Sequence, residues 1–129
     1  MNKQNSIERD LDVLARLAAK LLAVPVVTIS TYETDDGADS ATQTVAHNAV
    51  ACDSGWANRH TDIDITQLGT PQTAVAQHFE FYAAVPMRNG DGQVLGMVAC
   101  VDDDARELSE EELETLKHIS ALAITALRR

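Results

Sequence analysis

Two cysteines, four histidines and several groups of aspartates are the side chains of this 129-residue chain that could perform chemistry. The cysteines, Cys52 and Cys100, lie too far apart in the sequence for a CxxC redox or zinc pair. They permit a two-step thiol mechanism, in which one thiolate attacks and the second cysteine resolves the product. Cys100 lies in an apolar stretch, and a small buried side chain is the simpler interpretation of both. We therefore predict no catalytic residue.

The four histidines do not form a recognisable metal site. His47, His60, His78 and His118 show none of the close spacings that metal ligands adopt. His60 and His78 flank an irregular middle section and could reach one cavity, although a solvated or hydrogen-bonded loop histidine is the simpler interpretation. We expect His118 on a helix surface or in a dimer contact.

Aspartates gather in three places, which are Asp35, Asp36 and Asp39, then Asp62 and Asp64, and then Asp102, Asp103 and Asp104. A calcium-binding loop needs alternating oxygen ligands, a central glycine and a distal glutamate. None of the three groups has this pattern, so solvated loops and helix starts explain them better. We predict no metal site.

Trp56 is the best candidate for a pocket residue. A lone tryptophan in a polar segment that contains glycine is costly to leave in water, so it should cover either the edge of the core or a bound ligand. If the chain has a pocket, its expected lining is Ser30, Tyr32, Trp56, His60, His78 and Phe81. A register error of one residue would reverse the face on which a strand residue lies.

Composition excludes several classes of function. The formal net charge is −10 and the sequence pI is about 4.6, so the average surface repels nucleic acid and anionic lipid. No apolar run approaches the roughly 20 residues of a membrane span, and the start MNKQNSIERD lacks the apolar core of a signal peptide. We expect one domain, residues 1–129, in the cytoplasm, with neither nucleic acid nor membrane as a partner.

The first half of the chain predicts a helix and two strands. Apolar residues recur at helical spacing over 7–22, where Ser6 can cap the first turn. The β-branched run VPVVTIST predicts a strand over 25–32, and ATQTVAHNAVA predicts a second over 41–51. The acidic stretch ETDDGADS between them is typical of a loop. Residues 52–77 carry no clear pattern.

The second half gives a clearer pattern. Alternating apolar residues predict a strand over 79–87, NGDG is typical of a tight hairpin turn, and residues 93–102 form the return strand. Ser109 and Glu112 have the spacing of a capping box that opens a helix over 110–127. The apolar stripe of this helix is wider than one sheet face needs, so a second partner is expected, either the first helix or another subunit.

The stretches FEFYAAVPM and VLGMVACVDDDARELSEEEL resemble the C-terminal half of a GAF domain, in the form where Cys-Val-x-Asp ends a strand and Arg-x-Leu-Ser-x-Glu follows. The matching positions are Cys100, Val101, Asp102, Arg106, Leu108, Ser109 and Glu111. LDVLARLAAKLLAVPVVTIST resembles the opening helix and first strand of the family, so the resemblance covers residues 11–32 and 78–127. It places Asp102 at the end of the return strand, where we expect it to anchor the turn into Arg106.

The middle of the chain departs from the family. Many members have a longer segment there, with a helix that roofs the ligand pocket, whereas this chain has about 45 mostly polar residues between Thr31 and His78. The Asn-Lys-Phe-Asp-Glu signature of cyclic-nucleotide-binding members is missing. The surroundings of Cys52, NAVACDSGWA, do not resemble the bilin attachment site, so no cofactor is identified.

The resemblance implies an α+β fold, in which an antiparallel sheet of about five to six strands carries the N- and C-terminal helices on one face and a small-molecule pocket on the other. It implies a non-catalytic sensory or regulatory module of bacterial type, paired as a homodimer through its terminal helices and signalling to an output protein. Two alternatives stay open. One is a GAF-like free methionine sulfoxide reductase that uses cysteine chemistry, and the other is a dimerisation scaffold that binds no ligand.

Overall fold

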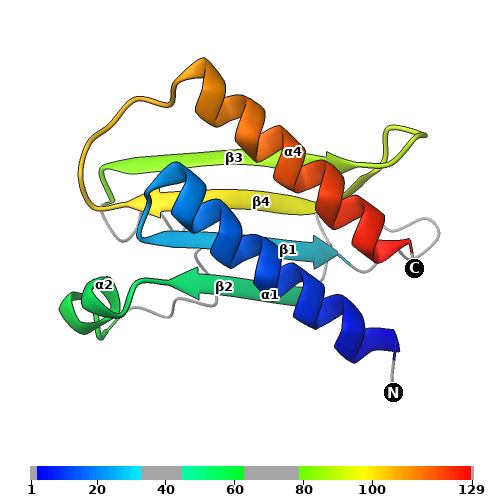
Figure 1. The fold of residues 1–129 in the computed structure, drawn as a ribbon, viewed down its shortest axis with the longest axis horizontal. Helices are drawn as coiled ribbons and strands as arrows, with labels where there is room; N and C mark the ends of the chain where they lie inside the picture. Colours follow the sequence, from blue (N-terminus) through cyan, green and yellow to red (C-terminus); the bar gives the residue numbers. More distant parts are fainter. Residues whose placement is uncertain (1–2, 33–44, 63–78, 129) are drawn as a thin grey trace.

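The computed structural model describes residues 3–32, 45–62 and 79–128, in which a four-stranded antiparallel sheet carries two long helices on one face (Figure 1). The helices and strands are α1 (Lys3–Leu22), β1 (Val26–Tyr32), β2 (Val45–Cys52), α2 (Ser54–Arg59), β3 (Phe81–Arg88), β4 (Val94–Asp102) and α4 (Glu110–Leu127). The strand order is β2-β1-β4-β3, so the first and last strands of the chain lie together at the centre of the sheet.

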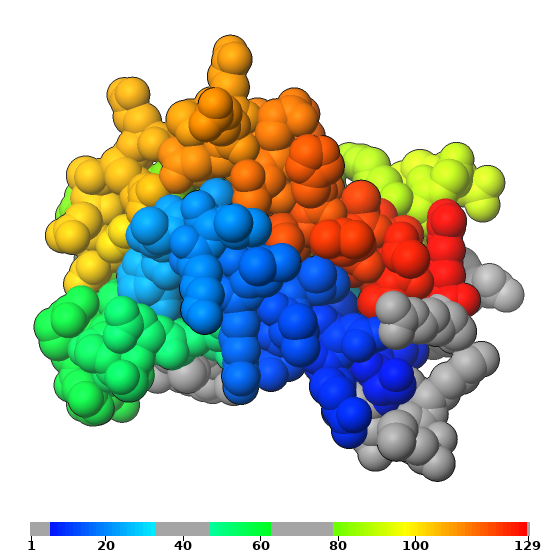
Figure 2. Space-filling view, viewed as in Figure 1, coloured from blue at the N-terminus to red at the C-terminus, as the bar shows by residue number. Residues whose placement is uncertain are grey.

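The core lies between the sheet and the two helices. Leu11, Ala15, Ala18 and Leu22 recur at helical spacing along α1 and are fully or almost fully buried against the sheet. From α4, Leu116, Ile119 and Ala123 complete the same cluster. In the space-filling view from the helix side, α1 and α4 meet along their length and cover the sheet (Figure 2). The first helix is thus a second packing partner for α4, as the wide apolar stripe predicted.

The β3–β4 hairpin follows the predicted turn chemistry. Asn89 Oδ1 accepts hydrogen bonds from the amides of Asp91 and Gln93, and Gly92 adopts a φ of +82°, which glycine tolerates without strain. Ser109 and Glu112 form the predicted capping box, with each side chain accepting the other residue's amide. These local signals fix the hairpin and the start of α4.

Arg106 joins the end of β4 to both long helices. Its guanidinium donates to Asp102 Oδ2 at 3.4 Å and to Glu112 Oε2 at 2.8 Å. It also donates to the carbonyl oxygens of Leu22, the last residue of α1, and of Ala23, the residue after it, each at 3.0 Å. The expected anchoring of the turn by Asp102 is confirmed, and the same arginine supplies donors that the end of α1 lacks.

Two differences from the sequence prediction stand out. The described residues contain four strands rather than five to six, and the expected loop at 33–40 and strand residues 41–44 lie outside them. The unassigned segment after β2 contains the short helix α2. Asp53 caps this helix, because its side chain accepts the amide of Gly55 at 2.8 Å.

Candidate ligand-binding face

The candidate site is the face of the sheet opposite α1 and α4, which we call the distal face. Side chains alternate along a strand, and Val27 and Ile29 of β1 point into the helix-side core, so Val26, Thr28 and Ser30 point the other way. Pairing across the sheet extends the distal face to Asn48, Val50 and Cys52 of β2, Met97, Ala99 and Val101 of β4, and Tyr82, Ala84 and Pro86 of β3.

Small side chains occupy the centre of the distal face. Thr28 pairs with Ala99, and Ala99 pairs with Ala84 on its other side. The neighbouring row of the distal face has larger side chains, those of Val26, Val101 and Tyr82. We call the row of Thr28, Ala99 and Ala84 the floor; Thr28 and Ala99 are at most 1% exposed and Ala84 is half-buried, so protein atoms already cover most of it.

Trp56 closes one end of this floor. The short helix α2 holds the indole fully buried against Val26 and Val101. His60, one turn later, stacks on the indole with ring centroids 4.1 Å apart and an interplanar angle of 15°. Its Nδ1 lies 2.9 Å from the Trp56 carbonyl oxygen, and its Nε2 lies 3.6 Å from Asp103. The side chains of Trp56 and His60 thus pack together as one unit.

Two buried polar atoms at the distal face have no hydrogen-bond partner among the described residues. Ser30 donates to Asn48 Oδ1 at 3.0 Å and is satisfied. Thr28 is only 1% exposed, yet its hydroxyl has no hydrogen-bond partner within the described parts of the chain. The same holds there for the indole nitrogen of Trp56, which is fully buried. Such groups cost free energy unless something bonds to them, so each is a candidate contact for a ligand.

Two tyrosines also belong to this region. Tyr82 is half-buried, and burial together with the nearby hydroxyl of Tyr32 raises its pKa to about 12. Tyr82 is therefore uncharged at neutral pH.

The predicted lining is only partly brought together. Ser30, Tyr32, Trp56 and His60 belong to the distal face or to the helix that closes it, whereas Phe81 lies in the helix-side core. Arg106 lies over the Phe81 ring, with the guanidinium carbon 5.5 Å from its centroid. The alternation of β3 therefore points Tyr82, and not Phe81, to the distal face. His78 lies outside the described residues.

Sequence reasoning missed Thr28, Asn48, Tyr82 and the two alanines of the floor. A signal for Thr28 existed, since it lies two residues before Ser30 and so shares its face. Small alanines and the strand pairing that aligns them give no such signal, because register depends on contacts between distant parts of the chain.

The two thiols lie on opposite faces of the sheet. Cys52 belongs to the distal face, next to Trp56, and Cys100 belongs to the helix-side core. Burial raises the pKa of Cys100 to about 11 and also raises the pKa of Cys52. A pair of thiols arranged in this way can neither act together nor supply a thiolate readily at neutral pH.

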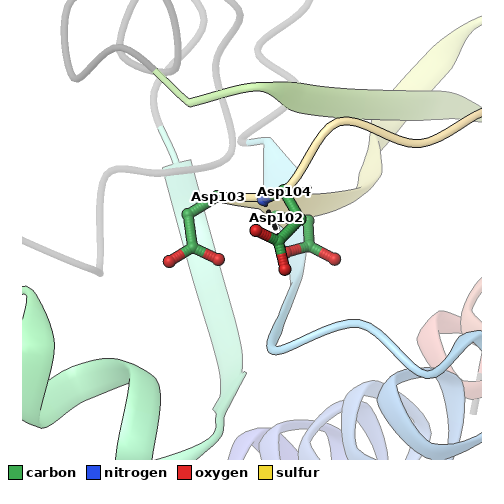
Figure 3. A group of neighbouring side chains, drawn as sticks. All are labelled: Asp102, Asp103 and Asp104. Atoms are coloured by element: carbon green, nitrogen blue, oxygen red, sulfur yellow. Dashed lines mark hydrogen bonds between the residues drawn. The ribbon is translucent and has the colours of Figure 1, made fainter.

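The third aspartate group forms a compact cluster at the end of β4. The carboxylates of Asp102, Asp103 and Asp104 lie within 4.8 Å of one another and point to the same side (Figure 3). Asp102 is already engaged by the amide of Asp104 and by Arg106, and Asp103 lies 3.7 Å from Arg59. The cluster borders an open cleft of about 960 Å³ beside the end of α1. The hydrogen bonds and ion pairs of the three aspartates stabilise the turn into α4.

Comparison with known proteins identifies the fold. The blue-light absorbing form of the PixJ GAF domain from Thermosynechococcus elongatus is 17% identical, with a TM-score of 0.62, over 98% of this chain and 88% of that one. The chromophore-binding domain of the bacteriophytochrome RpBphP3 from R. palustris is 11% identical, with a TM-score of 0.66, over 97% and 57% of the two chains. Residues 122 to 287 of a methyl-accepting chemotaxis protein are 20% identical, with a TM-score of 0.55, over 98% and 93%.

Sequence comparison agrees with this fold. No curated protein matches the chain. Within the described residues, none of the helices has the length and apolar character that crossing a membrane requires. The GAF domain model matches residues 6–127, which is nearly the whole sequence. This chain therefore belongs to the GAF domain family.

Proposed function

We propose that this protein is a non-catalytic sensory module that binds a small molecule on the distal face. The observation that carries the proposal is the buried Thr28 hydroxyl, which lies on a floor of small side chains and lacks a partner among the described residues. A purely structural sheet face would gain stability from valine at this position, since valine has the same shape and no unsatisfied hydroxyl. The solved structures similar to this chain include a light-absorbing GAF domain and part of a methyl-accepting chemotaxis protein, which supports a sensory role.

A thiol enzyme fits the structure less well. Reduction of a sulfoxide by two cysteines needs an accessible thiolate and a second thiol within reach of it. The separation of Cys52 and Cys100 across the sheet, together with the raised pKa of each, opposes both requirements. The sensory proposal needs neither thiol.

We place the output of the module on the outer surface of its terminal helices, in the cytoplasm, and propose that two copies pair there. Large apolar side chains remain exposed on this surface, namely Val13, Leu17 and Leu21 of α1 and Leu113 and Leu122 of α4. Exposed leucines and valines grouped on two adjacent helices are typical of an interface. A ligand that shifts α4 against α1 would change how two copies, or a copy and an output protein, pack together.

Native mass spectrometry of freshly purified protein tests both parts. We expect a dimer that retains an additional small mass. A ligand-free dimer would favour a dimerisation scaffold over a sensor, and a ligand-free monomer would contradict both parts. Leu21→Gln should weaken the dimer, whereas Lys117→Gln, also on an exposed helix position, should not.

A further inference from the structure

Lys20 of α1 and Glu114 of α4 point straight out from the layer that the two helices form. Positions about two and a half turns apart lie on opposite sides of an α-helix. Lys20 has this relation to Leu11, and Glu114 has it to Ala123, and both of these core residues are fully buried. Lys20 and Glu114 are exposed, and neither side chain has a hydrogen bond or an ion pair within the parts of the chain that the structure describes.

These two opposite charges also lie at the same height along the helices. The helices α1 and α4 pack side by side and run in opposite directions (Figure 1). One nitrogen of Arg106, Nη2, donates both to the Leu22 carbonyl oxygen and to Glu112 Oε2, so the end of α1 is level with the start of α4. Two residues back from Leu22 along α1 is Lys20, and two residues on from Glu112 along α4 is Glu114. The two charges are therefore level with each other.

Exposed leucines follow the line on the surface along which α1 and α4 meet, which we call the seam (Figure 2). The helix α1 packs over β1 and β2, and α4 packs over β3 and β4. Leu17 lies on the side of α1 opposite Glu8, which pairs with His47 of β2, so Leu17 faces α4. Leu122 lies nearly opposite Ser120, which donates to a backbone oxygen of β3, so Leu122 faces α1. The two leucines are 43% and 50% exposed, and a partner seated on the seam would bury both.

We propose that the partner at this surface is a second copy of the chain, related by a two-fold axis that runs along the seam, and that Lys20 of each copy pairs with Glu114 of the other. A half-turn about an axis parallel to the helices keeps the height of every residue and exchanges the two sides of the seam. It therefore lays α1 of one copy across α4 of the other, and brings a cation to an anion twice. The complementarity of these charges selects a second copy as the occupant.

This geometry surrounds the axis with Leu17 and Leu122 from both copies. The apolar side chains would form the centre of the interface and the two ion pairs would fix its register, a division of roles common at protein interfaces. The inference rests on the pairing proposed above and specifies how the two copies meet.

Two charge reversals, studied alone and as a mixture, test the geometry. Lys20→Glu sets two carboxylates against each other at both contacts, and Glu114→Lys sets two ammonium groups against each other. Each variant alone should dimerise at least about tenfold more weakly than the wild type. A heterodimer of the two variants regains both ion pairs with the charges exchanged, so it should form within about threefold of the wild-type affinity. Native mass spectrometry with one variant isotopically labelled measures both homodimers and the heterodimer together.

Two double variants provide the matched control. Lys20→Glu with Glu114→Lys in one chain should restore the dimer. Lys20→Glu with Glu107→Lys has the same net charge, but Glu107 is exposed and precedes α4, so it is not level with Lys20. This second combination should dimerise as weakly as Lys20→Glu alone.

The outcomes separate this geometry from the pairing on which it rests. A wild-type dimer that Glu114→Lys leaves unchanged, or single variants that pair with themselves as readily as with each other, would overturn the geometry alone. Rescue by Glu107→Lys would also overturn it, because net charge and not position would then control assembly. A monomeric wild type would overturn both the geometry and the proposed pairing.

Discussion

Ala23 occupies a backbone conformation that favours glycine. It follows the last residue of α1 and has a φ of +54°, the only positive value for a residue other than glycine in the described parts of the chain. Val24 donates to the Ala19 carbonyl oxygen at 3.2 Å, the bond that typically closes a helix through a left-handed residue. Ala23→Gly should therefore stabilise the protein.

The size of the effect follows from two opposing terms. A side chain with a β-carbon costs about 1–2 kcal/mol in the left-handed region, and glycine removes this cost. Glycine also makes the unfolded chain more flexible, which offsets about 0.4–1 kcal/mol. The net gain in the free energy of unfolding should be about 0.5–1 kcal/mol, equivalent to a rise in Tm of roughly 2 °C.

Urea unfolding of the wild type and two variants measures this directly. Ala121→Gly is the matched control, because Ala121 is exposed in the middle of α4, where glycine should lower the free energy of unfolding by about 1 kcal/mol. The two identical substitutions should change stability in opposite directions. If Ala23→Gly also lowered the urea midpoint by a similar amount, the left-handed end of α1 would be refuted.

Three further predictions concern packing, thiols and pH. Gly96→Ala should lower the free energy of unfolding by about 3 kcal/mol, because a β-carbon at this position would collide with the backbone oxygen of Ser30 in β1. Thermal unfolding would measure this loss, and a variant as stable as the wild type would contradict the prediction. An aromatic disulfide reagent near pH 8 should label Cys52 slowly and Cys100 only after unfolding, because burial raises the pKa of Cys100 to about 11; rapid labelling of both would contradict this. Hydrogen bonds to Ser109 at the helix cap lower the pKa of Glu112 below its ordinary value of 4.5, so the stability that Glu112 contributes is present above pH 4.5 and is lost as the pH falls through the folded-state pKa. Glu112→Gln should therefore make the stability of the protein less dependent on pH in this range. An unchanged acid-unfolding profile would count against the capping box.

The sequence predicted best the elements that local chemistry specifies. The capping box at Ser109 and Glu112 set the predicted bounds of α4, 110–127, which agree with the structure. The NGDG turn and the alternation on either side of it located β3 and β4 to within about two residues. Strands 25–32 and 41–51 were also predicted close to their observed positions over the described residues.

Features that depend on distant contacts were harder to predict. Phe81 was expected in a pocket, but the register of β3 directs it to the helix-side core, beneath Arg106. The hydrogen bonds from Arg106 to the end of α1 join residues more than 80 positions apart, so no local sequence pattern predicts them. The helix α2 is six residues long, too short for apolar periodicity to reveal it, although Asp53 could have marked its start.

The central claim is that a small molecule binds over the floor of the distal face. Its most direct test compares native mass spectra of the wild type and Ala84→Leu, in which a larger side chain fills the half-buried end of the floor on β3. We predict an additional mass on the wild type that is lost from Ala84→Leu while the folded charge-state distribution is preserved. An unliganded wild type, or the same additional mass on both proteins, would contradict the claim.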